Sequence, residues 1–123
     1  MSAEDWSPSD LPAVSYIRVA PTTTDAAARE VERQRAQIAL AGQRLGLRMA
    51  DEFVDVGYSG MSMDRPDLRR LLDYVAGHRV GFCVVATRDR LSEDPEHMAD
   101  LDQALDDALV AIVVAADHTG HGD

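Results

Sequence analysis

The chain has 123 residues, of which 46% are hydrophobic and 28% are charged, and a formal net charge of -10 at pH 7. Its length suits one domain with one core, and its apolar content excludes disorder throughout. The acidic excess repels DNA, RNA and anionic lipid, so composition argues against a nucleic-acid partner, and any basic footprint must be local.

The sequence holds no segment that would direct the chain to a membrane. No apolar run approaches the about 20 residues that span a bilayer. Residues 1–12 are acidic and turn-rich, unlike a signal peptide, and are expected to form a flexible leader. The single Cys83 lies in an apolar stretch, where a buried, unreactive thiol is expected. These features predict a cytoplasmic protein.

The first strand and helix are predicted from the sequence up to Gly46. Residues 13–20 (AVSYIRVA) form a β-branched run typical of a strand. A helix over residues 26–45 is expected to be capped by Thr24 or Asp25 and to stop at Gly46. Its predicted apolar face consists of Ala28, Val31, Ile38 and Leu45.

A second strand and helix follow. Residues 47–55 predict a strand and residues 56–64 a flexible loop. Pro66 fits the first turn of the next helix, and Gly77 and His78 fit its end. The spacing of its apolar residues is typical of a packed helix: Leu68, Leu71, Leu72 and Val75.

The last third of the chain repeats this alternation. Residues 81–87 are continuously apolar, as in a strand covered on both faces. Pro95 is expected to open a third helix, residues 109–116 a last buried strand, and residues 117–123 a flexible tail. The inner face of the third helix is predicted to contain Met98, Leu101 and Leu105.

The order of elements predicts a three-layer α/β/α domain with a mostly parallel four-stranded sheet. In such sheets, ligands bind beyond the carboxyl ends of the strands. Charged residues gather there: Arg18, Asp55, Arg65, Arg88, Asp89 and Arg90. Arginine holds two phosphate oxygens in its planar fork and stabilises charge that develops on phosphorus. This edge therefore suggests an anion site, with no evident nucleophile.

Five collinear motifs resemble one family: YIRVA, VERQR, FVDVGYSG, DRPDLRRLL and RDRLSE. They resemble the catalytic domain of serine recombinases, the resolvase/invertase group, and the DVGYSG loop is most similar to that of large serine integrases. The resemblance covers about residues 14–116, nearly all of a domain expected over residues 13–116, and implies the resolvase catalytic-domain fold. It also implies DNA cleavage by a serine that forms a 5′-phosphoserine link, followed by strand rejoining, with no metal or other cofactor.

The resemblance carries most of the family's active-site positions onto this chain. The matching residues are Arg18, Gln34, Asp55, Ser59, Arg65, Asp89 and Arg90. Two positions depart from the pattern: the family's serine nucleophile is Ala20 here, and a further arginine is Glu93. A methyl group cannot attack phosphorus. Two like charges about 4 Å apart repel by roughly 4 kcal/mol at an effective dielectric of about 20, before screening by salt.

Other hydroxyl groups are poorly placed to replace the serine. Strand alternation points Ser15 to the face opposite Arg18 and Ala20. The remaining candidates lie in loops, whereas catalytic geometry tolerates an error of about 0.5 Å. These are Thr22, Thr23, Thr24, Ser59 and Ser62.

Simpler structural roles remain open for several of these residues. Arg18 could be a buried arginine paired with Asp55 or Asp89, and the charges after the third strand could be solvated. His118 and His121 fit a tail better than a metal site. One helix face carries Glu96, Asp100, Asp102, Asp106 and Asp107, which fits either a solvated surface or a docking face for a basic partner.

Three hypotheses about function follow. The first is a non-catalytic interaction or regulatory module that binds a protein partner or itself. The second is a DNA recombination component that keeps weak DNA binding or acts beside an active subunit. The third is binding of a small phosphorylated ligand by Arg18, Arg65 and Arg90. Few residues follow Ala116, so the family's long dimerisation helix is expected to be missing.

Overall fold

The structure is a computed structural model that describes residues 11–119. Most of the predicted leader and the last four residues of the predicted tail lie outside the described residues. The elements are β1 (Pro12–Val19), α1 (Thr24–Leu45), β2 (Arg48–Val56), α2 (Pro66–Gly77), β3 (Phe82–Val85), the 3₁₀ helix η3 (Arg88–Arg90), α3 (Pro95–Asp107), β4 (Ala111–Val114) and the 3₁₀ helix η4 (Ala115–Asp117).

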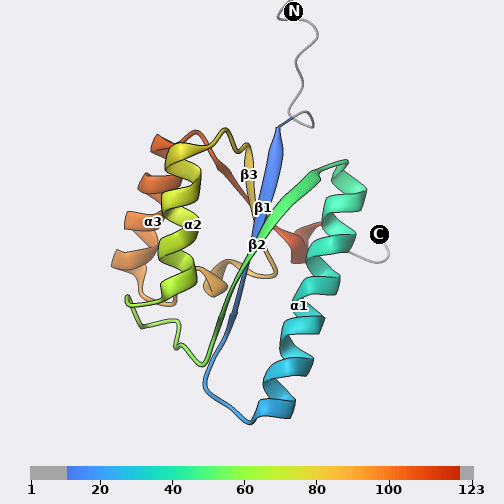
Figure 1. Ribbon diagram of the computed structural model, residues 1–123, viewed down its shortest axis with the longest axis vertical. Coiled ribbons are helices and arrows are strands. Elements are labelled where there is room, and N and C mark those ends of the chain that lie inside the picture. Colours follow the sequence, from blue (N-terminus) through green and yellow to red (C-terminus); the bar gives the residue numbers. More distant parts are fainter. Residues whose placement is uncertain (1–10, 120–123) are drawn as a thin grey trace, which may run out of the picture.

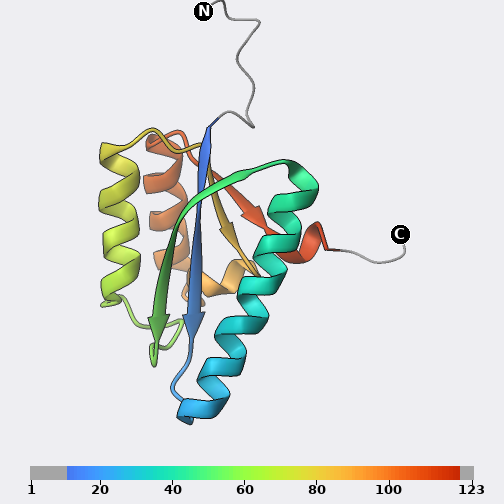
Figure 2. The same ribbon diagram turned by 45° about the vertical axis from the view of Figure 1, so that its right-hand side comes forward.

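The strands form one parallel sheet in the order β2-β1-β3-β4. Helix α1 covers one face of the sheet, and α2 and α3 lie side by side on the other (Figure 1). Figure 2 shows β1 between β2 and β3, with α1 running beside it. The predicted three-layer α/β/α fold with a parallel four-stranded sheet is therefore confirmed.

Alternating side chains of β1 divide the core into two halves. Val14 and Tyr16 pack with the buried faces of α2 and α3, whereas Ala13, Ile17 and Val19 pack against α1. The predicted inner faces of α2 and α3 are confirmed, with Leu72 only partly buried. The buried residues of these faces are Leu68, Leu71, Val75, Met98, Leu101 and Leu105.

The predicted apolar face of α1 is partly wrong. Ala28 is exposed and Leu45 is 39% exposed, whereas Gln34 is fully buried. The prediction counted only apolar residues, so it did not find the buried face of α1, in which the polar residue Gln34 occupies a core position. This face consists of Ala27, Gln34, Ile38, Ala41 and Gly42.

The ends of the elements also differ from prediction. Thr23, rather than Thr24 or Asp25, caps α1, and its hydroxyl accepts a hydrogen bond from the Ala26 N–H at 3.2 Å. Pro12, predicted in the leader, begins β1. The last strand is limited to Ala111–Val114, because Leu109 takes a positive φ of 61° and the residues after Val114 form η4.

Burial raises the pKa of the Cys83 thiol to about 12, which keeps it protonated and unreactive. Of the helices that the structure describes, none combines the length and the apolar character needed to cross a membrane.

We expect Leu71→Ala to lower the free energy of unfolding by about 2–5 kcal/mol, because the leucine is fully buried and its loss leaves a cavity. Leu72→Ala removes the same atoms from a partly buried site on the same helix and should cost clearly less. Urea denaturation measures both losses. Equal losses would show that the buried face of α2 is misplaced.

Candidate active site

The predicted cluster lies at the carboxyl ends of β1, β2 and β3. Arg18 is 1% exposed, and its guanidinium donates hydrogen bonds to three backbone carbonyl oxygens and one carboxylate. The acceptors are the Arg90 oxygen at 3.1 Å, the Tyr58 oxygen at 3.1 Å, the Asp89 oxygen at 2.9 Å and Glu93 Oε2 at 3.2 Å. The carboxylate that pairs with Arg18 therefore belongs to Glu93, rather than to Asp55 or Asp89, which were the alternatives left open by the sequence.

Arg65 is the second buried guanidinium of the site, also 1% exposed. Like Arg18, it donates to the carbonyl oxygen of Arg90, so two cations converge on one backbone group of η3. Its acceptors are the Ser62 oxygen at 2.9 Å, Tyr16 Oη at 3.3 Å, the Arg90 oxygen at 3.2 Å and the Leu91 oxygen at 2.5 Å. Every guanidinium nitrogen of Arg18 and Arg65 thus has an acceptor inside the protein.

Asp55 serves as the cap of α2 from the end of β2. The N-cap residue of α2, Arg65, makes no side-chain capping bond, so the first N–H groups of the helix need another acceptor. The carboxylate of Asp55 accepts from the N–H groups of Asp67 at 2.9 Å and Leu68 at 3.0 Å. Asp67 in turn accepts from the Val54 N–H at 2.9 Å. These reciprocal bonds tie α2 to β2.

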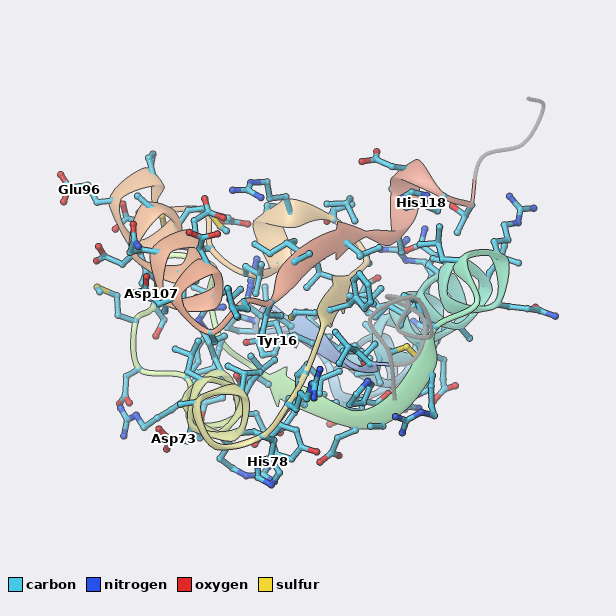
Figure 3. All side chains as sticks on the ribbon, turned by 90° about the horizontal axis from the view of Figure 1, so that it is seen from above. Tyr16, Asp73, His78, Glu96, Asp107 and His118 are labelled. Carbon is cyan, nitrogen blue, oxygen red and sulfur yellow. The ribbon has the colours of Figure 1, made fainter. Side chains whose placement is uncertain are left out.

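The Tyr16 hydroxyl completes this buried network. It donates to Asp55 Oδ2 at 2.7 Å, and Figure 3 shows the residue near the centre of the molecule. Burial, together with the hydrogen bond to Asp55, raises the pKa of Tyr16 above its usual value. The phenol therefore stays protonated and is a poor nucleophile. Sequence reasoning did not include Tyr16, although strand alternation places it on the same face as Arg18.

Helix α1 brings two polar side chains to the site. Gln34 is fully buried and donates to the Arg18 backbone oxygen at 2.9 Å and to Glu30 Oε2 at 2.9 Å. Glu30 also pairs with Arg90 at 3.3 Å and with Arg33 at 2.7 Å. The hydrogen bond from Arg33 is the largest cause that lowers the pKa of Glu30. Sequence reasoning missed Glu30, which lies far along the chain from its partner Arg90.

The other expected site residues make local contacts. Ser59 is exposed, and its hydroxyl accepts from the Met61 N–H at 3.0 Å. The Asp89 carboxylate accepts from the Thr87 hydroxyl at 2.5 Å. Ala20 is exposed directly after β1. The structure thus joins Arg18, Gln34, Asp55, Arg65, Arg90 and Glu93 in one network, and leaves the side chains of Ser59 and Asp89 outside it.

Gly60 brings the loop after β2 directly against Glu93. A Cβ at this position would lie 2.5 Å from Glu93 Cγ and 2.7 Å from Arg18 Nη2. The Gly60 carbonyl oxygen accepts from the Glu93 N–H at 2.9 Å and from the Ser92 hydroxyl at 3.2 Å. The glycine therefore allows the close contact that holds Glu93 beside Arg18.

The described residues contain no cluster of three potential metal ligands.

The fold is that of a known class of DNA-recombining enzymes. The solved structures similar to this chain include the C-terminal catalytic domain of IS1535 TnpA, an IS607-like serine recombinase (31% identity, TM-score 0.66, covering 83% of this chain and 69% of that one). They also include the N-terminal catalytic domain of TP901-1 integrase (18% identity, TM-score 0.75, covering 87% of this chain and 78% of that one). A third is a resolvase family site-specific recombinase from Streptococcus pneumoniae (21% identity, TM-score 0.74, covering 88% of this chain and 74% of that one).

The family itself is shown by the sequence. The sequence model of the family described as resolvase, N-terminal domain, matches residues 13–122 of this chain. No curated protein sequence matches the chain. The chain belongs to the resolvase family, and the resemblance to serine recombinases is confirmed.

We expect Asp55→Ala to lower the free energy of unfolding by about 1–3 kcal/mol, because two helix N–H groups and the Tyr16 hydroxyl lose their acceptor. Asp64→Ala is the matched control, since this aspartate forms an ion pair with Arg69 while 88% exposed. Thermal or urea denaturation measures the difference. An equal effect of both variants would contradict the capping role.

We also expect Glu30→Gln to change how stability depends on pH. The folded-state pKa of Glu30 lies below its ordinary value of 4.5, so the carboxylate stabilises the fold above that pH and loses this contribution as the pH falls through the depressed value. Wild type and Glu30→Gln should therefore differ in stability near neutral pH and converge in acid. Glu96→Gln, on the surface of α3, controls for the loss of one negative charge. A difference that grows in acid would contradict the ion pair.

Proposed function

We propose that this resolvase-family domain does not carry out strand transfer and acts as a non-catalytic interaction or regulatory module. The observation that carries the proposal is Ala20, which stands where the family motif has its nucleophilic serine. The reaction of the family begins with a hydroxyl oxygen that attacks phosphorus, and alanine has no such atom.

The other hydroxyl groups near the site do not replace the missing one. Tyr16 is fully buried and held protonated by its surroundings. Ser92 is 5% exposed and donates to the Gly60 carbonyl oxygen. Ser59 is exposed, but it belongs to a turn after β2 rather than to the end of β1. Their positions support the proposal that no hydroxyl group of this domain attacks phosphorus in place of the missing serine.

The charges around the site weigh against phosphate binding. Glu93 replaces a family arginine and lies 3.2 Å from Arg18, where an incoming phosphate would meet a negative charge. Arg90, which is 22% exposed, is paired with Glu30. The Glu93 side chain is 47% exposed, so water and salt weaken the repulsion. With Arg18 and Arg65 bonded to protein acceptors, the third hypothesis, a small phosphorylated ligand, has little support.

We expect the wild-type chain to show no salt-dependent binding to labelled duplex DNA at micromolar protein and about 50 mM salt. Glu93→Arg should gain binding that weakens as salt rises, because it adds a cation beside Arg18. Glu96→Arg makes the same charge change on α3 and should gain less. Fluorescence anisotropy measures all three.

A denaturing gel tests the chemistry separately. The unmodified chain and Glu93→Arg should form no covalent adduct with DNA, and any adduct should require Ala20→Ser. An adduct formed by the unmodified chain would refute the loss of chemistry. Salt-dependent DNA binding by the wild type without an adduct would favour the second hypothesis, a recombination component that retains weak DNA affinity.

A further inference from the structure

A cleft between α1 and β2 lies on the sheet face that α1 covers (Figure 1). Its volume is about 290 Å³, at the lower end of the range of ligand pockets. The Arg35–Glu52 ion pair, with two bonds of 2.8 Å, bounds one end. Two turns along α1, about 10 Å away, Met49 lies against Gly42, where a Cβ would come within 3.4 Å of the methionine sulfur. The cleft therefore has room for one large side chain.

An irregularity in β2 gives the cleft apolar walls. The pairing of β1 with β2 skips Ala50, which leaves a bulge in β2 at this residue. A bulge re-aims side chains, and here the successive residues Met49 and Ala50 both line the cleft. From α1, Ile38 and Ala39 line it as well. Because Ala39 and Ala50 are small and exposed, the walls are apolar and open to a ligand.

The floor of the cleft carries a hydroxyl group that makes no hydrogen bond. Ser15 of β1 lines the cleft and is only 4% exposed. Within residues 11–119 its hydroxyl has no hydrogen-bond partner, although most buried polar side-chain atoms have one. The strand alternation that keeps Ser15 away from the candidate active site points it into this cleft instead. A polar group that reaches the floor therefore gains a hydrogen bond.

The charges at the rim of the cleft select the kind of ligand. Arg35 is paired with two carboxylates, those of Glu32 and Glu52. The carboxylate of Asp51, which is exposed and lines the cleft, has no ion-pair partner in the part of the chain that the structure describes. A second copy of the chain would bring a further charge of -10 toward these carboxylates. A basic partner is complementary instead.

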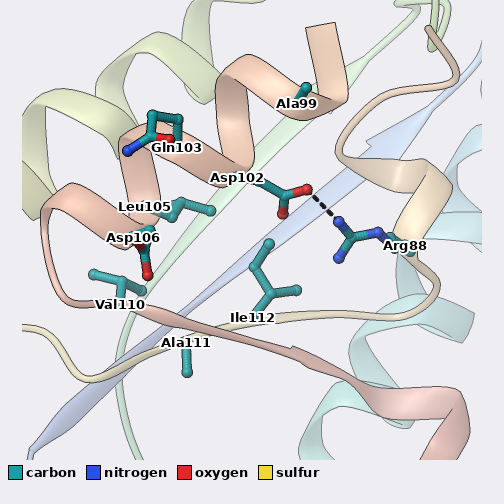
Figure 4. Close-up of a pocket in the computed structure, with 9 residues that line it drawn as sticks. All are labelled: Arg88, Ala99, Asp102, Gln103, Leu105, Asp106, Val110, Ala111 and Ile112. Carbon is teal, nitrogen blue, oxygen red and sulfur yellow. Dashed lines mark hydrogen bonds and ion pairs between the residues drawn. The ribbon is translucent and has the colours of Figure 1, made fainter. Parts of the chain in front are cut away.

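A second hollow, of about 460 Å³ between α3 and β4, lacks a comparable group. Figure 4 shows Arg88 bonded to Asp102 beside it, and neither side chain is buried. Its other polar residues, Gln103 and Asp106, are exposed. Leu105, which is buried in its lining, is apolar. Among the described lining residues of this hollow, no buried polar side chain lacks a partner, so the observations favour the cleft beside Ser15.

We propose that the cleft binds a tyrosine side chain of a partner protein, in a segment where an arginine or lysine lies beside the tyrosine. The ring packs between the apolar walls, its hydroxyl bonds to Ser15 at the floor, and the neighbouring cation pairs with Asp51. Tyrosine fits because it combines an apolar body with a polar tip, whereas phenylalanine has no group that could bond to the serine. The inference rests on the proposed function, because it names the partner class of that interaction module.

The test titrates the isotope-labelled full chain with a peptide that carries one tyrosine between two arginines. We expect saturable shifts of the Ser15, Ala39 and Ala50 amide signals in NMR spectra, with a Kd below about 1 mM. A peptide with phenylalanine in place of the tyrosine should bind about two- to tenfold more weakly, because one neutral hydrogen bond is lost. A peptide with glutamates in place of both arginines should also bind more weakly.

Two variants test the polar contacts. Ser15→Ala should weaken binding of the tyrosine peptide about two- to tenfold and leave the phenylalanine peptide unchanged, since both changes remove the same hydrogen bond. Asp51→Asn should weaken binding about two- to fivefold. Asp73→Asn, which makes the same change at an exposed position of α2, is the control and should leave affinity unchanged.

A matched pair of variants locates the site. Ala39→Phe fills the cleft from α1 and should weaken binding at least about tenfold. Ala36→Phe makes the same change at another exposed position of α1, outside the cleft lining, and should leave affinity unchanged. If Ser15→Ala or Ala39→Phe fails to fold, the comparison of the tyrosine and phenylalanine peptides on the wild-type chain still decides.

Equal binding of the tyrosine and phenylalanine peptides would overturn the proposal, as would equal effects of Ala39→Phe and Ala36→Phe. A dimer that Ala39→Phe dissociates would identify a second copy as the occupant and also overturn it. The DNA experiments fail independently: an adduct formed by a chain that still binds the peptide would refute the proposed function and leave the cleft site standing.

Discussion

The carboxyl edge of the sheet depends on two buried guanidinium groups that share one carbonyl oxygen. Arg18 from β1 and Arg65 from the start of α2 both donate to the backbone of Arg90 in η3. A buried cation is costly unless its donors are satisfied, and here carbonyl dipoles satisfy most of them. The loops after β2 and β3 are thereby fixed to β1. Ala20 takes no part in these bonds, so the shape of the site does not depend on the side chain at that position.

The order of elements and the parallel sheet were predictable because continuous apolar runs alternate with amphipathic segments. The apolar faces of α2 and α3 followed from spacing alone. The face of α1 did not, because Gln34 fills a core position that counting apolar residues passes over. The cap of α1 was uncertain for a similar reason: three consecutive threonines carry the same capping signal, and only the backbone geometry selects Thr23.

The residue types of the site were predictable, but their partners were not. Strand ends identified Arg18, Asp55 and Arg90 as neighbours, because parallel strands end at one edge. The sequence could not show whether these groups face solvent or the protein. Asp55 caps a helix, and Arg90 pairs with Glu30, a partner 60 residues away. Such pairings depend on side-chain directions that spacing along the chain does not contain.

Acidic side chains extend from the site along helix α3. A hollow beside η3 is lined by three carboxylates, Asp89, Glu93 and Asp94, together with Arg88, and continues to the first turn of α3. From there the carboxylates of α3 extend toward the hollow between α3 and β4. A polyanion that approached Arg18 from this side would meet these charges first, whereas a basic protein segment would be attracted along the same path. The acidic charge near the site therefore opposes the approach of a polyanion from the side of α3.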